Sequence, residues 1–180
     1  MSELTTKEKR NLGKYLVGKS IIEKLPDNVR YRGYYGTWAF SHRVEDEAEP
    51  RGYKIDDTAN DAVRFLAKAH LPEAWEMLGN FCGSVANYEW ENRETGCYFN
   101  GNGAFDYLVY FGIRAYLLAG EEQKAISLVD KFSHRHLITH SLKNSFATAG
   151  TEEPKMKYDS FDLPSLDDFV EFKERVLAID

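Results

Sequence analysis

Residues 104–132 read AFDYLVYFGIRAYLLAGEEQKAISLVDKF, and this stretch indicates the architecture of the chain. Its first half is apolar almost all round, which predicts a helix through Leu118 at the centre of a helical core. Gly120 ends that helix, and Glu121 and Glu122 open the next, where negative charge suits the positive end of the helix dipole. A tight corner between two helices predicts a central antiparallel helix hairpin.

The small residues of this hairpin also show a local resemblance to a known repeat. Tyr116, Gly120 and Ala125 have the spacing of Tyr, Gly and Ala across the helix-turn-helix of a tetratricopeptide repeat. The match covers one unit, and the residues one repeat length earlier do not continue it. Because repeat arrays need ~3 or more units to bury their faces, we predict a compact bundle and not a solenoid.

The N-terminal stretch predicts a helix from about Thr6 to Lys24, which Pro26 stops. Apolar residues recur along it at helical spacing, and this stripe is expected to face the core. The expected buried residues are Leu12, Tyr15, Leu16, Ile22 and Leu25.

Three further helices follow from similar signals. Asp57 or Thr58 caps one helix, Pro72 begins another that reaches about Trp90, and Ser165 with Asp168 forms a capping-box-like start for the last. The first of these helices is expected to bury Ala62, Val63, Phe65, Leu66 and Ala69. The last is expected to bury Leu166, Phe169, Val170, Phe172, Val176 and Leu177.

The segment near residues 27–56 has no regular periodicity and predicts a long, irregular, aromatic-rich connection. The whole chain, residues 1–180, is therefore predicted to be one all-α domain, a compact bundle of about six helices around the central hairpin. A chain of 180 residues that is 43% hydrophobic can bury a core without a disulfide or a metal.

Composition also limits the cellular setting and the partners. Cys82 and Cys97 are interpreted as reduced thiols, the N-terminus lacks the apolar region of a signal peptide, and the longest apolar run is too short to span a bilayer. We therefore predict a cytoplasmic protein with no membrane contact. The net charge of −6 makes general nucleic-acid binding unlikely on electrostatic grounds.

The strongest functional indication is an aromatic segment beside a run of carboxylates. Tyr and Trp concentrate at the energetic centres of protein interfaces, and an acidic surface attracts a basic partner. The aromatic segment could equally be core. The candidate partner-binding residues are Tyr34, Tyr35, Trp38, Glu45, Asp46, Glu47, Glu49, Asp56 and Asp57.

No catalytic signature and no cofactor motif is recognised, so catalytic residues are not assigned and whether the chain is an enzyme stays uncertain. The leading hypothesis is a non-catalytic protein-binding domain. Its most concrete form is a small acidic cytosolic inhibitor, comparable to bacterial immunity proteins, that neutralises a basic partner such as a toxin domain.

Three alternatives stay open. The first is a small enzyme or metal-binding protein. His136 and His140 share a helix face and, with His134, could hold a transition metal, and Glu89 and Glu91 are the carboxylates that could take part in its chemistry. A helical scaffold or homodimer could bury the central apolar helix between subunits. The basic N-terminal helix could contact RNA, with the aromatic segment offering stacking surfaces.

Overall fold

The computed structural model describes residues 3–25, 57–91, 104–135, 142 and 166–180. Helices account for nearly all of these ranges, which contain no strand, so the all-α prediction is confirmed. In chain order they are α1 (Thr6–Lys24), α3 (Asp57–Ala69), α4 (Pro72–Glu91), α5 (Ala104–Ala119), α6 (Glu122–Phe132), the short 3-10 helix η1 (Leu166–Asp168) and α8 (Val170–Leu177).

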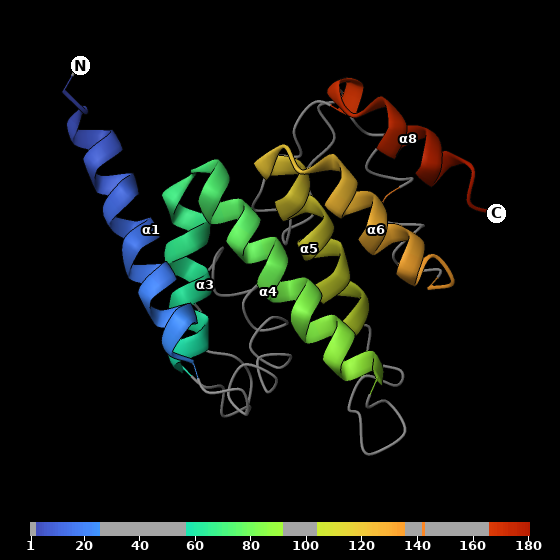
Figure 1. Cartoon of the computed structure of the whole chain (residues 1–180), viewed down its shortest axis with the longest axis horizontal. Helices are drawn as coiled ribbons and strands as arrows, with labels where there is room; N and C mark the ends of the chain where they lie inside the picture. Colours follow the sequence, from blue (N-terminus) through green and yellow to red (C-terminus); the bar gives the residue numbers. More distant parts are fainter. Residues whose placement is uncertain (1–2, 26–56, 92–103, 136–141, 143–165) are drawn as a thin grey trace, which may run out of the picture.

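The helices lie side by side in the order in which they occur along the chain (Figure 1). The closest packing joins α4 to α5 and α1 to α3. As a result, α1 and α8 lie at opposite ends of the molecule, with the α4–α5–α6 group between them. None of the helices in the described ranges combines the length and the apolar character needed to cross a membrane.

The core is centred on α5, as its uninterrupted apolar sequence predicts. Phe105, Leu108, Val109, Ile113 and Leu117 are each exposed by 1% or less. One continuous cluster of buried residues extends from Leu25 at the end of α1 to Val176 in α8. The central position of this helix is therefore confirmed.

The corner between α5 and α6 explains why a glycine occurs there. Gly120 has a φ of +79°, a left-handed conformation that side chains with a Cβ rarely adopt. Its N–H donates to the Leu117 carbonyl at 3.0 Å, and the Glu121 N–H donates to the Tyr116 carbonyl at 2.8 Å. These two bonds form a Schellman motif, which ends α5 and turns the chain directly into α6.

The bounds of α1 agree with the prediction, but its buried face does not. Thr5 and Glu8 form a reciprocal capping box at its start. Leu12 and Leu16, expected in the core, are 38% and 53% exposed, whereas Gly18 is buried.

The reason for this rotation of α1 lies in its contact with α3. A Cβ on Gly18 would lie only 3.0 Å from the backbone oxygen of Ala62 and 2.8 Å from Cγ of Leu66. Glycine at this position lets the two helix backbones come close together, so α1 turns its glycine toward α3. Leu25 is buried as expected, and Tyr15 and Ile22 are half-buried.

The last helix also differs from the prediction. The α-helix begins at Val170 after the turn η1, and Phe169 at its N-cap has no side-chain hydrogen bond. The Phe172 N–H donates to Oε1 of Glu122 in α6 at 2.9 Å, so a neighbouring helix caps α8. The expected capping pair of Ser165 and Asp168 includes a residue, Ser165, that lies outside the described part of the chain.

Besides Leu12 and Leu16, three further apolar side chains expected in the core are on the surface. Phe172 and Val176 of α8 are fully buried as predicted, but Val170 and Leu177 are 59% and 56% exposed, and Phe65 of α3 is 38% exposed. Helix α8 packs at the end of the row of helices, so its buried face is narrower than the periodicity alone indicates.

Candidate functional site

Most of the candidate partner-binding residues lie outside the described part of the chain. This applies to Tyr34, Tyr35, Trp38, Glu45, Asp46, Glu47, Glu49 and Asp56. Asp57 is the first residue of α3, with its side chain also outside the described part. Their assignment stays a prediction, as does the irregular connection around them.

Of the three candidate metal-ligating histidines, the structure describes only His134. Its ring lies 4.8 Å from the ring of Trp90, centroid to centroid, and Trp90 also contacts Phe105 at 5.9 Å and Phe132 at 6.0 Å. Histidine and tryptophan therefore meet at the end of α4 and the end of α6. In the described ranges, no group of three or more His, Cys, Asp or Glu residues could hold a metal ion.

A partly buried ion pair lies beside this aromatic group. Arg135, just after α6, donates from Nε to Oδ1 of Asp106 at 2.7 Å and from Nη2 to Oδ2 at 3.2 Å. Asp106 is 7% exposed and occupies the first turn of α5, where a carboxylate is stabilised by the helix dipole. The guanidinium carbon of Arg135 lies 5.4 Å from the ring centroid of Phe105. This two-point contact fastens the end of α6 to the start of α5.

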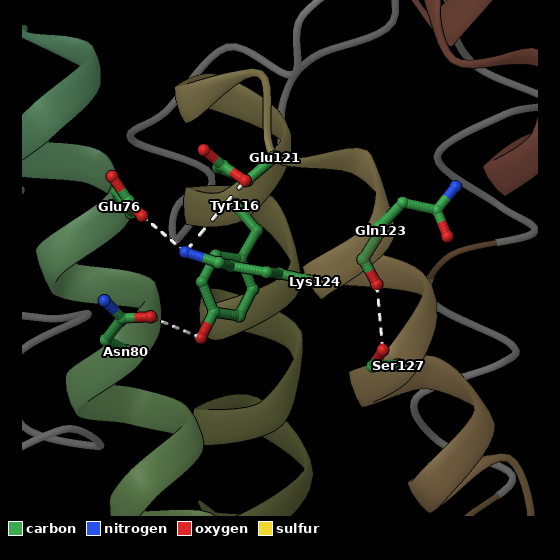
Figure 2. Close-up of polar contacts among 7 residues, drawn as sticks. All are labelled: Glu76, Asn80, Tyr116, Glu121, Gln123, Lys124 and Ser127. Atoms are coloured by element: carbon green, nitrogen blue, oxygen red, sulfur yellow. Dashed lines mark hydrogen bonds and ion pairs between the residues drawn. The ribbon is translucent and has the colours of Figure 1, made fainter.

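A second polar cluster connects the other ends of α4, α5 and α6 (Figure 2). The Tyr116 hydroxyl donates to Oδ1 of Asn80 at 2.8 Å. Lys124 donates to Glu76, and its Nζ lies 4.0 Å from Oε2 of Glu121 and 6.0 Å from the centroid of the Tyr116 ring. The lysine of α6 is therefore held between carboxylates of α4 and of the α5–α6 corner.

The pKa values of Tyr116, Lys124 and the nearby Cys82 indicate what chemistry these side chains can perform. Burial, followed by the electrostatic effects of Cys82, Glu76 and Glu121, raises the pKa of Tyr116 to about 12. The hydrogen bond to Glu76 raises the pKa of Lys124, and burial raises the pKa of the Cys82 thiol to about 12. At neutral pH the tyrosine and thiol are protonated and the lysine is charged, so none of the three is poised as a base or nucleophile.

An acidic surface that sequence reasoning did not identify lies where α6 meets α8. We call it the α6/α8 acidic surface. Glu122 accepts the Phe172 N–H, and Glu171 accepts a hydrogen bond from Nε2 of Gln123 at 2.8 Å, so the start of α8 lies against the start of α6. Lys173 approaches the carboxylate of Asp167, whose side chain is 87% exposed, to 3.7 Å. The carboxylates of this surface are Glu122, Glu171 and, in the turn just before α8, Asp167 and Asp168.

This surface escaped prediction because its two halves lie more than forty residues apart in the sequence. The usable signal was present in each half: paired acids stand at 121–122 and at 167–168, near the starts of two helices. In the sequence, Glu121 and Glu122 indicate an interaction with their own helix dipole, and Asp168 indicates a helix cap. No local pattern indicates that the two helix starts become neighbours.

Comparison of the chain with protein families, with characterised proteins and with solved structures finds no match.

Proposed function

We propose that this chain is a non-catalytic protein-binding domain that takes a basic protein partner. Its most concrete form is a small acidic inhibitor of the immunity type, which neutralises a basic domain such as a toxin. The observation that carries the proposal is the α6/α8 acidic surface, formed by carboxylates from two separate segments.

The carboxylates of this surface contribute little to the stability of the fold. Exposed carboxylates contribute about 0–1 kcal/mol each to folding when paired, and carboxylates of like charge close to one another repel. A concentration of them is useful for association, because it attracts an oppositely charged protein and raises the rate of encounter. The residues already predicted as partner contacts would add aromatic anchors, since Tyr34, Tyr35 and Trp38 are of the types enriched at interface centres.

The first test is a charge reversal that spares the fold. The variant Asp167→Lys/Asp168→Lys/Glu171→Lys changes the surface but keeps Glu122, which caps α8. The matched control, Glu3→Lys/Glu73→Lys/Glu91→Lys, makes the same change in net charge at exposed positions outside the surface.

Both variants and the parent protein are used to capture partners from lysate of the source cells, and the captured protein is then purified for kinetics. We expect a basic partner whose association rate falls at least about tenfold with the surface variant at low salt and converges with the parent at high salt. The control is expected to behave like the parent protein. Equal association rates for all three proteins at every salt concentration would contradict an electrostatic role for this surface.

A separate set of variants examines the aromatic and acidic segment. Glu45→Lys/Asp46→Lys/Glu47→Lys is expected to slow association, because it removes long-range attraction. Tyr34→Ala/Trp38→Ala is expected to accelerate dissociation, because it removes buried contact area. If neither set alters either rate, the segment belongs to the core or to an unrelated surface.

A further inference from the structure

Helix α8 is too short to be stable on its own. It contains eight residues, from Val170 to Leu177, and isolated helices shorter than about 12–15 residues are marginal in water. Its stability therefore comes from packing, and among the described elements α8 packs mainly on α6 (Figure 1). Phe172 and Val176 supply this packing, because both side chains are fully buried in the core.

Helices α6 and α8 run in the same direction, so their starts lie side by side. At the starts, Nε2 of Gln123 donates to Glu171 at 2.8 Å, and farther along both helices Arg175 lies 3.7 Å from Asp130. The N-terminus of each helix carries a partial positive charge, so two helix starts placed side by side repel each other. A negative group between them offsets this repulsion.

The carboxylate of Glu122 lies where the two helix starts meet. Glu122 belongs to the first turn of α6, and its Oε1 accepts the N–H of Phe172 at 2.9 Å. Phe172 is the third residue of α8, and the N–H at this position is one that an N-cap side chain ordinarily binds. Phe169, the N-cap residue of α8, makes no side-chain hydrogen bond there. The first turn of α8 is therefore completed by a residue of another helix.

We propose that α8 is a docking-dependent latch: it is helical only while it is seated on α6, and Glu122 links this seating to the formation of its first turn. Phe172 takes part in both contacts, because its side chain is buried and its N–H binds Glu122. When Phe172 leaves its site, α8 loses its packing and its cap in one step. Opening of α8 is therefore a cooperative local event that leaves α4, α5 and α6 folded.

The latch also controls the α6/α8 acidic surface, and this consequence rests on the proposed function. Asp167, Asp168 and Glu171 belong to η1 and α8, so they stand beside Glu122 only while α8 is seated. Release of α8 takes most of the surface apart. A basic partner that binds the assembled surface therefore favours the seated state, because a ligand shifts an equilibrium toward the state that it binds better.

Amide hydrogen exchange of the full-length protein tests the latch, because it reports the opening of each helix separately. In the parent protein, the amides of α8 are expected to exchange at least about tenfold faster than those of α5. Glu122→Ala removes the cap and is expected to accelerate exchange in α8 by about tenfold or more, as for the loss of a hydrogen bond to a charged group, without changing α5. Glu122→Gln keeps an acceptor oxygen, so exchange in α8 is expected to lie between the parent and Glu122→Ala.

A matched control removes the neighbouring carboxylate. Glu121→Ala deletes a charge at the start of α6 that faces Lys124 (Figure 2), and exchange in α8 is expected to match the parent. Phe172→Ala is expected to let α8 exchange as fast as unstructured chain while α5 stays protected. The proposal is overturned if α5 and α8 exchange together in the parent, if Glu122→Ala affects both helices equally, or if Glu121→Ala accelerates α8 as much as Glu122→Ala does.

A second measurement separates the latch from the proposed function. The probe is a fluorescent oligolysine peptide, whose binding to each full-length variant is titrated at low salt. Glu122→Ala and Glu122→Gln lose the same charge, so weaker binding by the alanine variant reports the release of α8. If the two variants bind the peptide equally while their exchange rates differ as expected, the latch is supported and the acidic surface as a binding site is contradicted.

Discussion

Helix α5 and helix α1 are both periodic, apolar-containing helices of similar length, but they contribute to the molecule in different ways. Nearly every described side chain of α5 is buried, whereas in α1 the buried position is Gly18 and three large apolar residues, Leu12, Leu16 and Val17, are exposed. A helix in the middle of a row of helices is covered on several sides, and a helix at the end is covered on one. The central helix therefore determines stability, and the end helix keeps a surface for contacts.

Truncating one leucine in each helix tests this difference in burial and has the largest expected effect. Leu108→Ala in α5 is expected to lower the free energy of unfolding by about 3 kcal/mol, since it leaves a cavity in a packed core. Leu16→Ala in α1 is expected to change it by less than about 0.5 kcal/mol, as for other surface sites. Urea denaturation measures both values. Similar losses at the two sites would show that α1 is buried in solution.

A second comparison concerns the ion pairs at the two ends of the α5–α6 hairpin. Arg135→Ala is expected to cost about 2 kcal/mol, because it leaves the carboxylate of Asp106, 7% exposed, without this partner. Lys124→Ala is expected to cost less than about 1 kcal/mol, since the lysine and Glu76 are both substantially exposed. Denaturation at low and high salt distinguishes the two, because only the exposed pair should be screened.

The two glycines of α1 allow a buried and an exposed position of the same helix to be compared. Gly18→Ala is expected to destabilise the protein by about 1.5 kcal/mol, because the new Cβ would lie 3.0 Å from the backbone oxygen of Ala62. Gly13→Ala is expected to stabilise it by roughly 0.5–1 kcal/mol, since a Cβ there meets nothing within 4 Å and alanine favours the helix. Thermal unfolding of both variants supplies the measurement. Equal effects would contradict the close approach of α1 to α3.

A further expected effect is at the hydrogen bond of Tyr116. Tyr116→Phe is expected to cost about 1 kcal/mol at neutral pH by removing the bond to Asn80. The folded-state pKa of about 12 lies above the ordinary value of 10, so the contribution of this group is full below pH 10 and is lost as the pH rises toward 12. The variant should therefore lose stability less steeply over that interval. Denaturation at several alkaline pH values checks this, and an unchanged slope would mean that Tyr116 titrates normally.

The helices themselves were largely predictable because their signals are local. Thr5 and Glu8 cap α1, Pro72 begins α4, and Gly120 ends α5 through a left-handed turn. Each of these residues acts within one turn of the backbone whose conformation it sets. Sequence spacing was therefore sufficient to place the ends of the elements within a few residues.

The faces and the site were less predictable because they depend on distant neighbours. The sequence of α1 contains Leu12 and Leu16 on one side and Ile22 and Leu25 on another, and the close approach of α3 to Gly18 selects the second. Similarly, Glu122 caps α8 across fifty residues, and Arg135 reaches Asp106 across twenty-nine. Such pairings follow from packing, which no local spacing encodes.

Packing in chain order also has a kinetic consequence. Because each helix contacts chiefly the helix before it and the helix after it, native pairs can form without the two ends of the polypeptide ever meeting. Folds dominated by contacts between sequence neighbours fold rapidly, and their outermost elements open most easily. Amide protons of α5 should therefore exchange with solvent only when the whole chain unfolds, and those of α1 and α8 should exchange through smaller, more frequent openings.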